Sequence, residues 1–157
     1  YKTKSRYPSF NVVESAVGQF TGQTTFTQII SRNADEEGCS SMEIIHNFPN
    51  AQYEKLLVPI TRFDIFLEKN ELTDTPIDIV KIDTEGFSWE VLMGMGDKIN
   101  NIKLLHIETE TFARHPGHKN NNEIKQFMEH SDFTLVDLSY EWGPLVEDQV
   151  WINKRFI

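Results

Sequence analysis

The stretch from Ile77 to Gly86 constrains the fold of this chain more than any other; it reads Ile-Asp-Ile-Val-Lys-Ile-Asp-Thr-Glu-Gly. Its β-branched residues predict a strand that is buried on both faces of a parallel sheet. Lys81 nevertheless lies inside the run, and Asp83 and Glu85 follow at its carboxyl end. Burying an unpaired charge costs far more than an apolar contact returns, so these charges indicate either a site or a paired structural group.

The residues after this strand predict how its charges are presented. Side chains alternate across a strand, so Lys81 and Asp83 share a face, and Glu85 joins them if the strand continues. Gly86 permits a sharp turn, and Phe87 to Gly96 is predicted to be the crossover helix. In open α/β sheets ligands bind at such strand-to-helix corners, so this corner is the first candidate site.

The second half of the chain alternates strands and helices, which is typical of an α/β fold. A second buried strand is predicted from Ile102 to Glu110, followed by a loop and by a helix capped by Asn121 or Asn122. Two further strands are predicted, from Phe133 to Leu138 and from Asp148 to Phe156.

The first half predicts strands followed by one helix. The strands Asn11 to Val17 and Gln23 to Ile30 are expected to form a hairpin across the glycines between them. Met42 to Leu57 is ambiguous between strand and helix. Thr61 is the expected N-cap of a helix from Arg62 to Asn70.

If the two buried strands are neighbours, four ionisable residues come together. Lys81 and Asp83 then lie beside His106 and Glu108, because alternate residues share a face. Such groups at the carboxyl edge of a parallel sheet tune one another's pKa values and exchange protons. We therefore predict catalytic roles for these four residues and for Glu85. The alternative is that Lys81 and Asp83 form only a structural ion pair.

A metal site is a second alternative at the same edge. Its ligands would be Glu108, Glu110 and His106, with His115 and His118 from the following loop. A carboxylate-rich set suits a hard divalent cation, but His-Pro-Gly-His matches no recognised zinc spacing. We therefore expect no resident metal ion.

Composition excludes several classes of protein. A formal net charge of −9 without a basic stripe argues against nucleic-acid binding. The chain has one cysteine, Cys39, which excludes an internal disulfide and a cysteine-based zinc site. No apolar run approaches the ~20 residues that span a membrane, and no signal-peptide pattern occurs, so we expect a cytoplasmic protein without membrane partners. The 157 residues suit a single domain, residues 1–157.

Short motifs narrow the function further. The chain contains no Gly-x-Ser-x-Gly elbow, Walker loop or dinucleotide fingerprint, so hydrolase, NTPase and standard dehydrogenase functions lack their defining parts.

The run Lys-Ile-Asp-Thr-Glu-Gly from Lys81, followed by Trp-Glu-Val-Leu-Met-Gly from Trp89, instead resembles the signature of the FkbM family of methyltransferases. That family shows Lys-Ile-Asp-Val-Glu-Gly and then Glu-x-x-Val-Leu-x-Gly. Weaker matches come in the same order on both sides, so the resemblance covers Asn11 to Asn153: Ala16-Val17-Gly18 with Gly22 and Phe26, the loop Gly38 to Ser41, Val58 to Leu67, and Leu105 to Glu108.

The resemblance implies a Rossmann-like class I fold that depends on S-adenosylmethionine, with a mostly parallel sheet ending in an antiparallel C-terminal hairpin. It implies methyl transfer to a hydroxyl of a small molecule or sugar. On this basis Asp83 and Glu85 line the cleft, Asp83 orients the methionine end of the cofactor or the acceptor, and Lys81 holds Asp83 ionised. Ala16 and Val17 would lie near the adenine.

The family's glycine-rich first strand-turn and the acidic end of its second strand, which hold the cofactor, precede the region matched by Asn11. This chain is therefore expected to resemble the C-terminal two-thirds of the family's domain and to lack its N-terminal first strands. The gap would expose strand edges that other chains could fill, as in a homo-oligomer. We expect an O-methyltransferase; the alternative is a non-catalytic methyltransferase-like remnant or interaction module. Variable loops would hold the acceptor: Ser31 to Ser41, Phe112 to Asn122 and Ser139 to Glu147.

Overall fold

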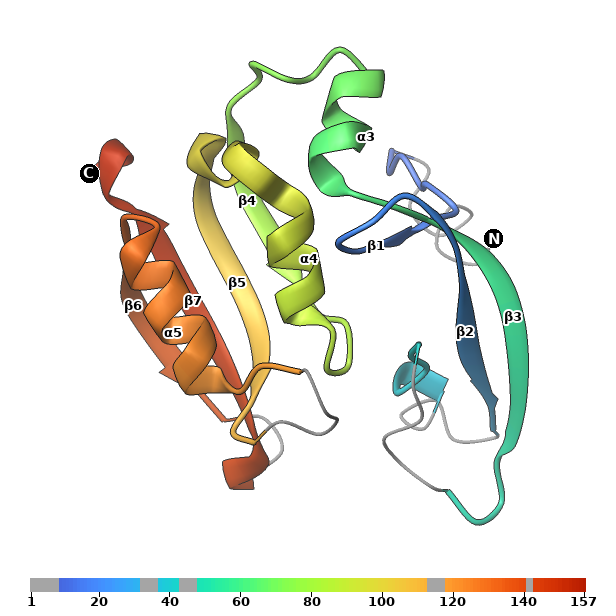
Figure 1. Ribbon diagram of the computed structural model, residues 1–157. Coiled ribbons are helices and arrows are strands. Elements are labelled where there is room, and N and C mark those ends of the chain that lie inside the picture. Colours follow the sequence, from blue (N-terminus) through green and yellow to red (C-terminus); the bar gives the residue numbers. More distant parts are fainter. Residues whose placement is uncertain (1–8, 32–36, 43–47, 113–117, 141–142) are drawn as a thin grey trace.

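The computed structural model describes residues 9–31, 37–42, 48–112, 118–140 and 143–157 (Figure 1). The described strands are β1 (Ala16–Val17), β2 (Gly22–Ile30), β3 (Gln52–Thr61), β4 (Ile77–Ile82), β5 (Ile102–Glu110), β6 (Phe133–Ser139) and β7 (Val146–Asn153). The described helices are α3 (Phe63–Lys69), α4 (Ser88–Met95) and α5 (Asn121–His130), with the short 3₁₀ helices η1 (Gly96–Asn101), η2 (Gly143–Leu145) and η3 (Lys154–Phe156). None of the described helices is long and apolar enough to cross a bilayer.

The described strands form two sheets, which Figure 1 shows on opposite sides of α4. One has the order β1-β3-β2 and the other the order β4-β5-β7-β6. Within the described residues, β1–β3 and β4–β5 are parallel, whereas β2–β3, β5–β7 and β6–β7 are antiparallel. The α/β prediction is confirmed, and so is the antiparallel pair at the C-terminus. The sheets are mixed, so the expectation of a mostly parallel sheet was wrong.

The strand after Pro76 is exposed on one face, which corrects the first prediction made from its sequence. Ile79 is 65% exposed and Ile82 is 2% exposed, so β4 buries one face only. The reason is that α4 and α5 both pack on the face that carries Ile82, and β4 is also an edge strand that pairs only with β5 among the described strands. An apolar run of residues indicates that a strand is hydrophobic, but it does not show which elements surround that strand.

The amino-terminal hairpin was assigned to the wrong pair of strands. The strand expected over residues 11–17 is reduced to Ala16–Val17, and it pairs in parallel with β3. The hairpin instead joins β2 to β3, with Gly22 opposite Ile60 and Ile30 opposite Gln52. The partner β3 begins within the ambiguous residues 42–57 and continues to Thr61, so the sequence pattern did not identify it as one strand.

Two helix caps lie one or two residues away from their predicted positions. Thr61 ends β3, and Arg62 occupies the N-cap of α3 without a side-chain capping bond. Asn120 caps α5: its side chain accepts hydrogen bonds from the backbone N–H groups of Asn122 and Glu123, and Glu123 completes the capping box. The predicted end of the crossover helix is confirmed, because Gly96 follows α4 with a φ of 51°.

The core of the four-stranded sheet lies between its strands and the helices α4 and α5, which cover the same face (Figure 1). Buried apolar side chains of the four strands, of both helices and of η1 pack together here: Ile82, Val91, Leu92, Met95, Ile99, Ile102, Leu105, Ile107, Ile124, Met128, Phe133 and Trp151. Burial of this cluster positions the carboxyl ends of β4 and β5 side by side.

Candidate functional site at the carboxyl ends of β4 and β5

The turn after β4 is built from two consecutive residues in the left-handed region. Glu85 has a φ of 50° and Gly86 a φ of 99°. A side chain beyond glycine is uncommon at positive φ, so the backbone at Glu85 is held there by its surroundings. Ser41, which is 3% exposed, donates a hydrogen bond from Oγ to the carbonyl oxygen of Glu85 at 3.1 Å. The loop beside the first sheet therefore fixes the turn that carries the motif.

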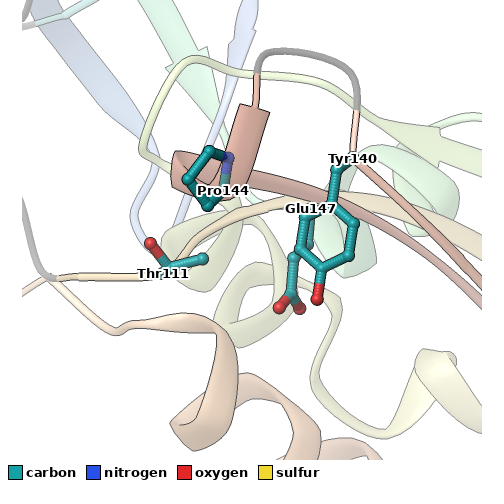
Figure 2. A pocket seen from close by; sticks show the side chains of 4 residues that line it. All are labelled: Thr111, Tyr140, Pro144 and Glu147. Carbon is teal, nitrogen blue, oxygen red and sulfur yellow. The ribbon is translucent and has the colours of Figure 1, made fainter.

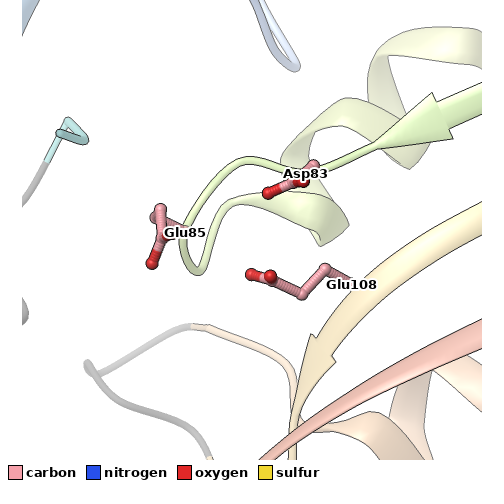
Figure 3. Close-up of side chains that lie close together, drawn as sticks. All are labelled: Asp83, Glu85 and Glu108. Carbon is pink, nitrogen blue, oxygen red and sulfur yellow. The ribbon is translucent and has the colours of Figure 1, made fainter. Parts of the chain in front are cut away.

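The end of β5 is hydrogen-bonded to the start of the helix that follows this turn. Ser88, the first residue of α4, donates from Oγ to the carbonyl oxygen of Glu108 at 2.7 Å. The strands are parallel neighbours with Lys81 opposite His106, which confirms the predicted proximity. Carboxylate oxygens of Asp83, Glu85 and Glu108 consequently lie within 4.8 Å of one another (Figure 3).

Lys81 and Asp83 form the ion pair that alternation predicted. Lys81 Nζ lies 3.0 Å from Asp83 Oδ2, and the two side chains are 50% and 46% exposed. A pair this exposed contributes little to stability, because solvent screens it. Lys81 offers one positive charge to a cluster of three carboxyl groups, so the cluster is not neutralised by this lysine alone.

Glu108 is the buried member of the cluster. Burial, together with the negative charges of Glu85, Asp83, Glu110 and Asp148, raises its pKa to about 8. Each of these causes disfavours the ionised form. Perturbed carboxyl groups of this kind gather at functional sites more often than elsewhere, which makes Glu108 the most informative residue of the corner.

His106 is held by a carboxylate that the sequence did not single out. Its Nε2 lies 2.6 Å from Oδ1 of Asp148, which is buried on β7. Asp148 lies opposite Glu108 in the β5–β7 register, so it also faces the cluster. A carboxylate bonded to one ring nitrogen fixes the orientation of an imidazole and favours one tautomer. The structure therefore fixes the His106 ring at the edge of the cluster, and its catalytic role stays a prediction.

The metal ligands considered from the sequence are not assembled as a set. Among the described residues, the group that could hold a metal ion consists of Asp83, Glu85 and Glu108, without His106, Glu110 or His118. The His118 ring packs edge-on against Phe87, with the ring centroids 4.8 Å apart. His115 lies outside the described residues.

The cofactor residues predicted from the family resemblance lie on the other sheet. Ala16 and Val17 form β1, whose neighbour Gly18 contacts α4 closely: a Cβ added to Gly94 would lie 2.1 Å from the Gly18 carbonyl oxygen. Val17 also packs against the core of the four-stranded sheet. These contacts place β1 next to the crossover helix, while its role toward adenine stays a prediction.

An open pocket of about 400 Å³ lies next to two of the loops predicted to hold an acceptor (Figure 2). It is lined by Thr111, Tyr140, Pro144 and Glu147. Glu147 lies opposite Thr109 and therefore projects from the face that does not carry Glu108. The pocket and the carboxylate cluster are on opposite faces of the sheet, so the pocket is not the site of the cluster.

Comparison with protein families identifies the chain. Residues 4–135 match the family model described as "Methyltransferase FkbM domain", and the matched region includes Asp83, Glu85, His106 and Glu108. Neither curated proteins nor solved structures gave a match. The matched region spans more than half of the chain, so this protein belongs to the FkbM methyltransferase family.

Proposed function

We propose that this chain is an S-adenosylmethionine-dependent O-methyltransferase domain with a Rossmann-like class I fold. The methyl acceptor is a hydroxyl of a small molecule or sugar. The observation that carries the proposal is the carboxylate cluster at the carboxyl ends of β4 and β5, in the region that matches the family. Ligands of open α/β sheets bind at this edge. The sulfonium of the donor is a cation, so a cluster of carboxylates is a favourable neighbour for it.

Methyl transfer from a sulfonium to oxygen is an in-line displacement: the C–S bond breaks as the O–C bond forms, and the hydroxyl loses its proton. Positioning supplies most of the rate enhancement of such a step. Asp83 is assigned to orient the methionine end of the donor or the acceptor hydroxyl, and Lys81 pairs with it at 3.0 Å. Glu108 and His106 are assigned to accept the proton that the hydroxyl loses, and Glu85 is assigned to the wall of the site.

The donor's adenine is assigned to Ala16 and Val17 on β1. This assignment is supported by the close contact between the Gly18 backbone and α4, because it keeps β1 beside the helix that follows the motif. The acceptor is assigned to the loops around the cluster. Methyl transfer is then assigned to the carboxyl ends of β4 and β5, beside the carboxylate cluster.

Calorimetric titration with S-adenosylmethionine and transfer of a tritiated methyl group to a panel of hydroxyl acceptors test the proposal. Both are measured on this chain and on a version extended upstream. We expect Asp83→Asn to abolish transfer while circular dichroism stays unchanged, and Asp78→Asn, an exposed carboxylate on the same strand, to leave transfer intact. Absence of donor binding in both versions would contradict the proposal.

One observation favours a second function, a non-catalytic interaction module. Among the described strands β4 lies at an edge of its sheet, and its Ile79 is 65% exposed; such an edge strand can pair with another chain. On this alternative neither version binds S-adenosylmethionine, and Ile79→Lys abolishes association with a partner or with a second copy. The titration described above separates the two functions.

A further inference from the structure

A buried carboxylate on β7 is bonded to the histidine beside the carboxylate cluster. Asp148 Oδ1 lies 2.6 Å from His106 Nε2, and the two side chains are 5% and 31% exposed, respectively. An ionised carboxylate only accepts hydrogen bonds, so Nε2 carries the proton of the neutral ring and donates the bond to Asp148. Nδ1 is then the ring nitrogen that is left to accept a proton.

The second oxygen of Asp148 indicates that stability alone does not account for this carboxylate. Within the described part of the chain, Asp148 Oδ2 is buried and has no hydrogen-bond partner. Burying a charged group without full compensation costs free energy, and replacing a buried ion pair by apolar residues often leaves a protein equally stable. Orientation of the His106 ring is therefore the better reason for an aspartate at this position.

The place of Asp148 in the sheet makes its contact with the ring rigid. β7 lies between β5 and β6, and Asp148 is paired with Glu108 on one side and with Ser139 on the other. His106 lies on β5, opposite Lys81 of the parallel neighbour β4. Groups that are mounted on strands are held more precisely than groups on loops. Both partners of the bond are therefore fixed near the carboxyl ends of β4 and β5.

We propose that Asp148 is a positioning residue for the proton transfer that accompanies methylation, and that it acts through His106. The proposal rests on the proposed function, because a hydroxyl that becomes methylated must release a proton. His106 Nδ1 takes this proton and later releases it to water, while the electron pair of the broken O–H bond stays on the oxygen that receives the methyl group. The Asp148 carboxylate neutralises the imidazolium ion that forms, in a buried setting where the attraction is stronger than in water.

The orientation of the ring is tested on the full chain without donor or acceptor, by ¹⁵N NMR, which distinguishes the two neutral tautomers of a histidine. His106→Gln assigns the signals of His106 by their loss. We expect the wild type to carry the proton on Nε2, and the form protonated on Nδ1 to appear in Asp148→Leu, which offers Nε2 no carboxylate. A wild-type ring protonated on Nδ1, or equal tautomer populations in the two proteins, would overturn the proposal.

The effect on methyl transfer is measured as kcat and KM, on this chain and on the version extended upstream. Asp148→Asn keeps the shape of the side chain and removes its charge, so it also serves if the leucine variant does not fold. It should lower kcat by at least about 10-fold, a part of the roughly 10²–10⁴-fold that proton transfer contributes, and leave KM unchanged. Asp137→Asn, which changes an exposed carboxylate on β6, is the control and should leave kcat intact.

A double variant shows whether Asp148 acts through the ring. In a chain that already carries His106→Gln, the Asp148→Asn change should lower kcat no further. Full transfer by Asp148→Asn alone, or losses that add up in the double variant, would overturn the role of Asp148 and leave the proposed function standing. Absence of transfer in every version would instead contradict the proposed function, and the proton-transfer role of Asp148 with it.

Discussion

Gly94 on α4 lies against the backbone of Gly18, so closely that a Cβ at position 94 would be 2.1 Å from the Gly18 carbonyl oxygen and 2.9 Å from its carbonyl carbon. Gly18 directly follows β1, and α4 follows the turn that carries the motif. The contact therefore joins the strand assigned to adenine to the helix assigned to the catalytic corner. It can exist only because position 94 lacks a side chain.

Gly94→Ala should accordingly destabilise the protein. Helix propensity alone would favour alanine inside α4 by roughly 0.5–1 kcal/mol. The clash is with backbone atoms that cannot rotate away, so we expect a net loss of about 3 kcal/mol in the free energy of unfolding. Urea denaturation measures it. Gly38→Ala is the matched control, since a Cβ there meets nothing within 4 Å; equal effects of the two substitutions would refute the packing argument.

A second prediction concerns the buried polar network behind the pocket. Glu147 Oε2 lies 2.9 Å from Lys125 Nζ, and the Glu147 side chain is 5% exposed. Asn121 and Gln149 donate hydrogen bonds to its two carboxylate oxygens at 2.7 and 3.1 Å. Burial raises the pKa of Glu147, but the hydrogen bonds from Lys125, Gln149 and Asn121 outweigh it and leave the pKa below its usual range.

Lys125→Met should therefore lower the free energy of unfolding at pH 7 by about 2–3 kcal/mol, because it leaves a buried carboxylate without its cation. A lowered pKa stabilises the folded state above the unfolded value near 4.5, and this stabilisation is lost as the pH falls through the lower folded value. The gap between variant and wild type should thus narrow below pH 4. Lys103→Met, which removes the exposed partner of Asp78, is the control and should have a smaller effect. An unchanged gap at acid pH would argue against the charge pair.

Local patterns were sufficient to predict which charged residues meet at the carboxyl ends of β4 and β5. The alternation of Lys81 and Asp83 determines which face they share, and parallel pairing of β4 with β5 then brings Glu108 close. Asp148 was missed because its role depends on β7 entering the sheet between β5 and β6. That strand order pairs β7 with β5, which is distant in sequence, and the periodicity of a single segment cannot predict such a pairing. A signal was present nonetheless, since Glu147, Asp148 and Gln149 are consecutive polar residues in a strand.

The errors in the first half have a related cause. Strand content was predicted correctly for β2, but its partner β3 lay in a segment whose pattern was ambiguous. Likewise the apolar residues of β4 could not show that one of its edges has no strand beside it in the described structure. The topology of the fold determines which strands pair with one another, whereas the composition of a segment indicates only its tendency to be buried.

The last prediction concerns the dependence of stability on Glu108 and pH. Its pKa is about 8 in the folded protein and near 4.5 when unfolded, so between these values the unfolded chain has released a proton that the folded chain retains. Stability therefore falls as the pH rises from about 4.5 to about 8 and is independent of this group above that range. The slope is at most on the order of 1.4 kcal/mol per pH unit. Glu108→Gln keeps the size of the side chain and removes the ionisation, so in chelator-containing buffer it should become progressively more stable than wild type across this window. Urea unfolding at half-unit pH intervals measures the difference in the free energy of unfolding, with Asp78→Asn as the control. Parallel pH profiles for Glu108→Gln and wild type would show that Glu108 titrates normally. That result would remove the main electrostatic argument for a functional site at the carboxyl ends of β4 and β5.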